Sequence, residues 1–230
     1  MHRSQNQFLL TRPLEGSTRL ARALMEENVP ADSIKIAPLM RVEFDAQTQS
    51  PEFDIAIFTS PSGVIAFNGV GGGRLAYCVG DRTAKVARDA GFTPVSANGG
   101  ASNLVALLIH DHPKGRICHF RGVKVHQNIA EPLFENGMHV IEQIVYQQIP
   151  QNFDESTLQM VSNADGLKIP LFSTETARQF EKQTINGLNC DIFCISKDVR
   201  RVLSAGKYRK ITVISEPTQI SMVQSLLAGN

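Results

Sequence analysis

The sequence predicts an α/β protein built on parallel β-sheets, and two observations carry this prediction. Short apolar runs recur along the chain, and each precedes a stretch whose apolar residues have helical spacing. Continuous apolar runs are typical of parallel strands buried on both faces, with crossover helices between them. The second observation is an internal repeat, which predicts two similar lobes of roughly 110 residues rather than one large sheet.

The expected strands alternate with the expected helices from the start of the chain to its end. Strands are expected at residues 8–10, 55–58, 77–79, 117–120, 192–195 and 211–214. The helices that follow them contain residues 20–24, 64–67, 84–90, 129–133, 199–203 and 222–226. Residues 33–39 and 138–146 also have strand character but do not fit a crossover unit. The second of these alternates partly polar positions, which suits a half-covered strand, so we expect both segments to link the lobes.

The internal repeat relates the first half of the chain to the second. Residues 8–12 and 117–122 each open a strand–helix unit, and residues 55–60 correspond to 167–173. Residues 77–80 correspond to 192–196, and the next helix ends at a turn glycine in each copy, Gly91 or Gly206. A strand and a last helix complete both copies. Chance similarity between α/β units is the alternative explanation.

Charge and composition exclude several classes of protein. The formal net charge is +1, which gives no reason to expect broad affinity for nucleic acid or anionic membranes. The longest apolar run, residues 104–109, is far shorter than the ~20 residues of a membrane span. The start of the chain lacks the apolar core of a signal peptide, and four cysteines do not make a disulfide scaffold. We therefore expect a cytoplasmic protein.

The loops that follow the expected strands carry the candidate chemistry. Ligands of open parallel sheets bind beyond the carboxyl ends of the strands, where helix starts offer free N–H groups. Nearly all of these loops carry Ser or Thr, and several carry a base. Hydroxyls and free N–H groups suit an anion, and ordinary helix capping is the alternative for any single loop. We expect an anion-binding cleft between the lobes, with candidates Thr11, Arg12, Ser60, Ser62, Arg82, Thr83, Arg121, Gly122, Ser173, Ser196, Lys197 and Thr218.

Other motifs indicate neither a metal nor a cofactor. The glycine-rich segment 69–73 follows a helix, whereas a dinucleotide fingerprint must follow a strand, so we interpret it as a flexible turn. The cluster at residues 110–112 lies at a helix end and is interpreted as capping or exposed polar residues. Cys78 and Cys118 lie inside expected strands and are interpreted as core residues. Cys190 and Cys194 lie four apart along an extended segment and are interpreted as a same-face core pair, with metal ligation as the alternative. No phosphate-binding loop and no serine nucleophile elbow occurs in the sequence.

The ordered set of loops resembles the uroporphyrinogen-III synthase family over essentially the whole chain. The resemblance rests on residues 10–13, 58–64, 79–84, 90–92, 121–122, 145–146 and 215–218 in that order. It implies two flavodoxin-like parallel-sheet lobes joined by a two-stranded linker. One lobe would be the continuous segment 38–147, and the other would combine residues 1–37 with 148–230.

The resemblance also implies an activity. Members of the family take hydroxymethylbilane, a linear tetrapyrrole with eight carboxylates, and close it with inversion of the last pyrrole ring and loss of water. No cofactor is used. The tyrosine of the family corresponds to Tyr146, which would donate a proton to the leaving hydroxyl. Its cleft hydroxyls correspond to Ser60, Thr83 and Thr218, whereas Arg12, Arg82, Arg121 and Lys197 are candidates from position alone. We expect a monomer that receives its substrate from the preceding pathway enzyme.

The second-copy loops depart from the pattern of the family. Residues 172–175 lack the Ser-Pro of the first copy, and residues 196–199 lack the usual small residue at the helix start. An inactive or slow member of the family is therefore an alternative to a fully active enzyme. Two other functions stay open, namely a two-lobed protein that binds an anionic ligand without chemistry and a flavin or nucleotide binder.

Overall fold

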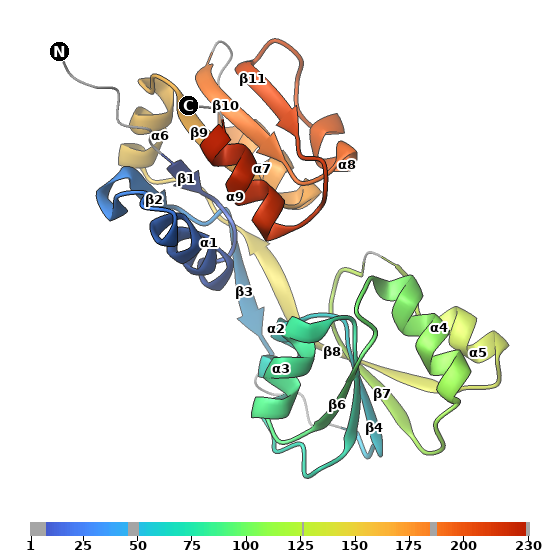
Figure 1. Cartoon of the computed structure of the whole chain (residues 1–230). Coiled ribbons are helices and arrows are strands. Elements are labelled where there is room, and N and C mark those ends of the chain that lie inside the picture. Colours follow the sequence, from blue (N-terminus) through green and yellow to red (C-terminus); the bar gives the residue numbers. More distant parts are fainter. Residues whose placement is uncertain (1–7, 46–50, 126, 185–187, 229–230) are drawn as a thin grey trace. The chain divides into compact units, whose positions relative to one another are not determined.

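A computed structural model describes residues 8–45, 51–125, 127–184 and 188–228, and these form two compact units (Figure 1). One unit is continuous and comprises residues 42–148, and the discontinuous unit comprises residues 1–41 and 149–230. Each unit has its own parallel sheet with helices on both faces. No helix among the described residues is both long and apolar enough to cross a bilayer. The expected α/β class with two parallel sheets is confirmed.

The discontinuous unit has a five-stranded sheet in the order β11-β10-β9-β1-β2. All its strand pairs are parallel. Numbered along the chain, this order is 2-1-3-4-5, the flavodoxin arrangement. The elements are β1 (Phe8–Leu10), α1 (Leu14–Glu26), η1 (Ala31–Ser33), β2 (Ile34–Ile36), α6 (Glu155–Ser162), β9 (Leu167–Leu171), α7 (Thr174–Gln183), β10 (Leu188–Cys194), α8 (Lys197–Arg201), β11 (Tyr208–Val213) and α9 (Gln219–Ala228).

The continuous unit has a six-stranded sheet in the order β3-β8-β7-β4-β5-β6. The pairs from β8 to β6 are parallel, and β3 lies beside β8 at the edge. Its elements are β3 (Met40–Phe44), β4 (Ile55–Phe58), α2 (Pro61–Phe67), β5 (Leu75–Cys78), α3 (Asp81–Asp89), β6 (Thr93–Ser96), α4 (Ala101–Asp111), β7 (Ile117–Gly122), α5 (Ala130–Glu135) and β8 (Val140–Pro150).

The strand orders of the two sheets agree with the internal repeat. The order β6-β5-β4-β7-β8 in one unit matches β11-β10-β9-β1-β2 in the other, position by position. The repeat pairs β4 with β9, β5 with β10 and β7 with β1, as the sequence predicts. Apart from the edge strand β3, each sheet therefore takes three strands from one copy of the repeat and two from the other. The two units are circular permutations of one strand arrangement.

The core of each unit lies on both faces of its sheet. In β4, Ile55 and Ile57 pack towards α4 and α5, whereas Ala56 and Phe58 pack towards α2 and α3. This alternation is what a strand covered on both faces requires. In the discontinuous unit, α1 and α9 cover one face and α6, α7 and α8 cover the other. All four cysteines are buried in these cores with free thiols.

The linker prediction needs one correction. Residues near Ile36 were expected to link the lobes, but β2 is a regular member of a sheet and pairs with β1 in parallel. The chain instead passes to the continuous unit within β3 and returns within β8. The Asp45 N–H donates to the Val145 carbonyl at 3.0 Å, and the Gln147 amide donates to Glu43 at 2.9 Å. Strand β3 is short and has only half-buried or exposed residues after Met40, which gives it little apolar signal in the sequence.

The glycine-rich segment is a turn, but it is a closely packed one. The Gly71 N–H donates to the Ala90 carbonyl at 2.8 Å, and a Cβ at Gly71 would lie 2.4 Å from the Phe92 nitrogen. A side chain there would collide with backbone, so glycine is required. Close packing against the end of α3 replaces the expected flexibility.

Candidate functional site

The candidate residues lie where the parallel strands end and the next helices begin. Thr11 and Arg12 follow β1, Ser60 precedes α2, and Ser173 and Ser196 precede α7 and α8. Arg82 and Thr83 lie in the first turn of α3, Ser62 in that of α2, and Thr218 directly precedes α9. Arg121 and Gly122 end β7, and Tyr146 lies within β8.

The continuous unit brings Ser60 and Tyr146 together. The Oγ of Ser60 lies 2.9 Å from the Oη of Tyr146, although 86 positions separate them in the sequence. Both side chains are half-buried, so the pair has one side in the protein and one towards solvent. The contact forms because β4, which leads to Ser60, and β8, which carries Tyr146, flank β7 in the sheet (Figure 1).

Ser60 is also the N-cap of α2. Its Oγ accepts the Gly63 N–H at 3.3 Å, and Pro61 occupies the first helical position, as is common. With one oxygen lone pair occupied by Gly63, the serine hydrogen is free to donate to Tyr146. In that arrangement the phenol hydrogen of Tyr146 is not used in the contact with Ser60 and is available to another acceptor. The pair is therefore suited to donate a proton from Tyr146 and to stabilise the phenolate that remains.

Gly122 makes room for the tyrosine ring. A Cβ at Gly122 would lie 2.8 Å from two ring carbons of Tyr146 and 3.2 Å from its Oη. The register between β7 and β8 shifts here, so that Arg121 faces Ile144 and Gly122 faces Tyr146. This irregularity turns Tyr146 onto the end of β7. The structure thus gives Gly122 a packing contact with Tyr146, whereas the sequence suggested a binding residue.

A second hydrogen bond holds the neighbouring threonine. The Oγ1 of Thr59 lies 3.2 Å from the Nε2 of His119 on β7. The Nδ1 of His119 lies 3.5 Å from an oxygen of Glu142, and Arg121 Nε lies 2.9 Å from the same oxygen. Burial lowers the pKa of His119 to about 4, and Glu142 only partly opposes this effect. Thr59, His119 and Glu142 are not among the candidates that the sequence predicts.

Strand pairing explains why these three residues escaped sequence reasoning. His119 and Glu142 are direct partners in the register of β7 and β8, and His119 is also paired with Ile57 of β4. In the sequence, His119 belongs to an apolar segment that predicts a strand. The one local sign of a special role is its polarity among Ile117, Cys118 and Phe120. The register itself is not encoded in any local motif.

Hydroxyl groups cap helices in the discontinuous unit. Ser173 accepts the Thr176 N–H at 3.2 Å, Ser196 accepts the Val199 N–H at 3.4 Å, and Thr218 accepts the Ser221 N–H at 3.1 Å. The capping alternative is thus part of what these side chains do. Capping occupies one lone pair and leaves a hydroxyl able to contact a ligand, so the anion-binding role stays a prediction.

The remaining candidates differ in exposure. Thr11 is fully buried, and its Oγ1 has no hydrogen-bond partner among the described residues. The Arg12 guanidinium stacks on the Phe172 ring, with its carbon 4.0 Å from the ring centre. Thr83 is buried, and Ser62 is half-buried. Arg82 and Lys197 are exposed. Exposed bases at helix starts suit carboxylate binding, and a buried threonine does not offer its hydroxyl to solvent.

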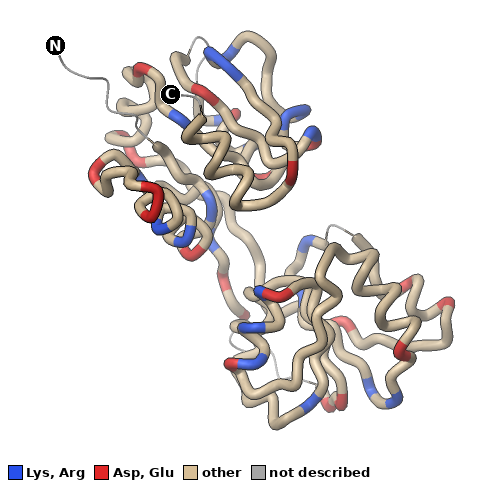
Figure 2. The backbone as a smooth tube through the Cα atoms, viewed as in Figure 1, with Lys and Arg blue, Asp and Glu red and all other residues tan. Residues whose placement is uncertain are grey.

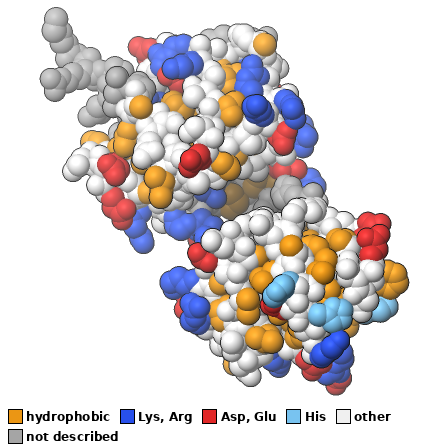
Figure 3. Space-filling model, turned by 45° about the vertical axis from the view of Figure 1, so that its right-hand side comes forward, with side chains coloured by type: hydrophobic (Ala, Val, Ile, Leu, Met, Phe, Trp, Pro, Cys, Tyr) orange, Lys and Arg blue, Asp and Glu red, His pale blue; other side chains and the backbone are white. Residues whose placement is uncertain are grey.

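Charge is evenly distributed over both units. Basic and acidic residues are interspersed over the tube in Figure 2, and the face in Figure 3 shows both signs. This pattern agrees with the net charge of +1. Any affinity for a polyanion must therefore come from local groups such as helix starts and single arginines.

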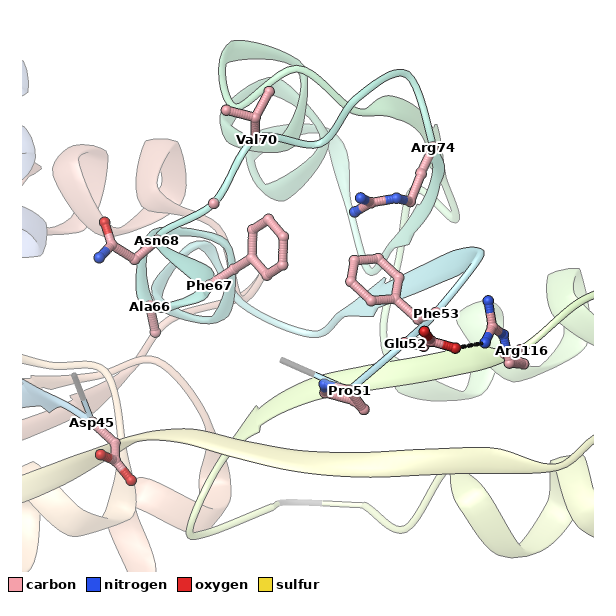
Figure 4. Close-up of a pocket in the computed structure, with 11 residues that line it drawn as sticks. Asp45, Pro51, Glu52, Phe53, Ala66, Phe67, Asn68, Val70, Arg74 and Arg116 are labelled. Carbon is pink, nitrogen blue, oxygen red and sulfur yellow. Dashed lines mark hydrogen bonds and ion pairs between the residues drawn. The ribbon is translucent and has the colours of Figure 1, made fainter. Parts of the chain in front are cut away.

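A pocket of about 600 Å³ in the continuous unit lies away from these residues (Figure 4). It is bordered by Phe53, Arg74 and Arg116, which lie at the amino-terminal ends of β4, β5 and β7, and by Phe67 at the end of α2. None of the candidate residues lines it. Arg116 pairs with Glu52 and Asp54, and Arg74 stacks on Phe53, so both cations are already engaged. We do not assign the pocket to the site.

Fold and site together define a class of protein. It is a two-unit α/β protein whose hydroxyl-bearing loops lie at the carboxyl ends of two parallel sheets, with one tyrosine hydroxyl held by a helix-capping serine. Residues 33–224 match the profile of the family described as uroporphyrinogen-III synthase HemD. The chain belongs to the uroporphyrinogen-III synthase family. It is a cyclising lyase of tetrapyrrole biosynthesis.

Solved structures agree with this assignment at the level of the fold. The uroporphyrinogen-III synthetase of Helicobacter pylori superposes with a TM-score of 0.69 at 14% identity, covering 98% of this chain and 100% of that one. A mutant uroporphyrinogen III synthase of the extremely thermophilic bacterium Thermus thermophilus gives a TM-score of 0.50 at 13% identity, covering 97% and 100%. A search of curated proteins finds no match.

Proposed function

We propose that this chain converts hydroxymethylbilane into uroporphyrinogen III, with Tyr146 as the proton donor to the leaving hydroxyl. The observation that carries the assignment to Tyr146 is its 2.9 Å contact with Ser60. Either hydroxyl could donate in this contact. We assign Ser60 as the donor, because its oxygen already accepts the Gly63 N–H at the start of α2, and this assignment leaves the phenol hydrogen for the substrate. A hydrogen bond to a developing phenolate is stronger than one to a neutral phenol.

The proton balance of the proposed step closes. Tyr146 gives its proton as the carbon–oxygen bond of the hydroxymethyl group breaks, so water leaves. The substrate loses a pyrrole N–H proton as the reactive azafulvene forms, and that proton restores the phenol. The terminal pyrrole then attacks the azafulvene carbon through its substituted α-carbon. The bond from that α-carbon to its original methylene breaks, and this methylene rejoins the other α-carbon, so the ring is inverted. The hydrogen of that second α-carbon leaves as a proton, and the azafulvene nitrogen takes up a proton, so the two balance. Tight folding of the substrate provides most of the remaining assistance.

Binding of the substrate carboxylates is assigned to the helix starts. We propose Ser62, Arg82 and Arg121 in the continuous unit, and Arg12, Ser173, Ser196, Lys197 and Thr218 in the discontinuous unit. What supports them is their position at the carboxyl ends of strands, where N–H groups and hydroxyls favour anions. Thr11 and Thr83 are left out because both are buried. Because the binding free energy is distributed over many contacts, loss of any single contact should raise KM only modestly.

Substrate supply, oligomeric state and cellular location complete the proposal. Its substrate closes spontaneously to the uninverted isomer, so direct supply by the preceding pathway enzyme would limit that loss. We propose a monomer in the cytoplasm. Four buried cysteines with free thiols suit a reducing compartment.

Product analysis tests the proposed function. Freshly made hydroxymethylbilane is added to the purified chain, and the uroporphyrin isomers are separated after oxidation. The expected result is the type III isomer at a rate proportional to protein concentration. Only type I isomer, formed at the rate without protein, would overturn the proposal. Slowed type I formation without type III would instead identify a binding protein without catalysis.

A further inference from the structure

A buried histidine reaches the loop that carries Ser60. The His119 side chain is only 1% exposed, and its Nε2 lies 3.2 Å from the Oγ1 of Thr59. Thr59 is the first residue after β4, and Ser60 follows it directly. The loop is therefore held at two successive hydroxyls, Thr59 by His119 and Ser60 by Tyr146.

The surroundings of His119 favour one direction for this hydrogen bond. Its Nδ1 lies 3.5 Å from Glu142, whose carboxylate also pairs with Arg121. Nδ1 makes no hydrogen bond among the described residues, but the negative charge of this carboxylate favours the tautomer with hydrogen on Nδ1, which we assign here. Nε2 is then an acceptor, and the Thr59 hydroxyl donates to it. Burial, which lowers the pKa of His119, keeps the ring neutral and so preserves this acceptor.

The two anchors lie on different strands and use different side-chain directions. His119 and Glu142 face each other across β7 and β8, whereas Tyr146 lies over Gly122 at the shifted end of the same pair. Thr59 and Ser60 are consecutive, so their side chains leave the loop in different directions. Rotation of the loop that kept one contact would strain the other. Together the two contacts fix where the Ser60 Oγ lies relative to Tyr146.

We propose that His119 is a positioning residue, which acts through the Thr59 hydroxyl to keep Ser60 within hydrogen-bond distance of Tyr146. This inference rests on the proposed function of the Ser60–Tyr146 pair. His119 itself touches no substrate, since its side chain is enclosed. We expect its effect on the turnover step rather than on substrate binding, because its Nε2 contacts the loop that carries Ser60 and only one proposed carboxylate-binding residue, Arg121, shares its partner Glu142.

A matched pair of substitutions separates positioning from packing. His119→Gln keeps an acceptor oxygen that can reach Thr59, whereas His119→Leu has similar bulk and no acceptor. We expect His119→Leu to lower kcat about tenfold with little change in KM, since about one hydrogen bond of positioning is lost. His119→Gln should retain most of the turnover. Thr59→Val should lower kcat about as much as His119→Leu.

The double variant His119→Leu with Thr59→Val decides the route of the effect. If His119 acts through Thr59, the double variant should be no slower than either single variant. Additive losses would overturn the inference, and so would equal losses in His119→Gln and His119→Leu. Unfolding free energies of all variants show whether turnover merely follows stability. A wild-type chain that forms no type III isomer refutes the proposed function, whereas an active wild type with unaffected His119→Leu refutes only the positioning role.

Discussion

The hydroxyl of Ser60 lies 2.9 Å from that of Tyr146, and the same serine caps helix α2. The Ser60 oxygen is thus in contact with both the start of α2 and the Tyr146 hydroxyl. The equivalent position in the repeat is Ser173, which caps α7 and makes its second hydrogen bond to the neighbouring Thr176 hydroxyl instead. Both serines cap a helix, but only Ser60 also contacts a tyrosine hydroxyl.

Replacing the two serines separates capping from chemistry. Ser60→Ala and Ser173→Ala should each lower the free energy of unfolding by about 1 kcal/mol, because each removes an N-cap. Only Ser60→Ala should lower kcat clearly, since only Ser60 contacts Tyr146. Denaturant unfolding and steady-state kinetics on both variants check this. Equal effects on kcat would show that the contact with Tyr146 does not contribute to turnover.

A methyl group at Gly122 should disturb Tyr146. A Cβ there would lie 2.8 Å from ring carbons of Tyr146, so the ring must move or the strands must separate. We expect Gly122→Ala to cost about 1–3 kcal/mol of stability and to lower kcat. Gly100→Ala is the control, because its nearest neighbour would lie 4.0 Å from the new Cβ. Normal turnover in Gly122→Ala would mean that the precise place of the ring is unimportant.

Acid should destabilise the continuous unit through His119. Its pKa falls from the ordinary 6.5 to about 4 because of burial, with Glu142 and Arg121 as the charged groups that face it. The unfolded chain therefore binds more protons between pH 6.5 and 4, and stability declines as the pH falls through that window. The loss from this group should be on the order of 2 kcal/mol by pH 4.5.

The comparison with His119→Gln isolates this effect from other titrating groups. Unfolding free energies of both proteins are measured from pH 8 to pH 4.5. The difference between them should be constant above pH 7 and should shift in favour of the variant at lower pH. Parallel curves throughout would show that His119 is not held neutral by the fold.

The sequence predicted most of the fold because the strands are buried on both faces. Runs such as residues 55–58 carry a strong apolar signal, and the repeat predicted which strands correspond. Strand β3 was not predicted because its exposed residues give no such signal. Strand β2 was predicted to be a linker because its pairing with β1 depends on residues far from it in the sequence. The sequence also placed Ser60 and Tyr146 among the candidates, but only the β7–β8 register brings His119 opposite Glu142 and turns Tyr146 over Gly122.

Removal of the Tyr146 hydroxyl tests the central claim most directly. Tyr146→Phe keeps the ring over Gly122 and deletes the proposed donor, so kcat for type III formation should fall about 10- to 100-fold with little change in KM. Tyr77→Phe is the matched control, because its hydroxyl donates to Asp111 away from the candidate residues and should be dispensable for turnover. Unchanged kcat in Tyr146→Phe would contradict the account.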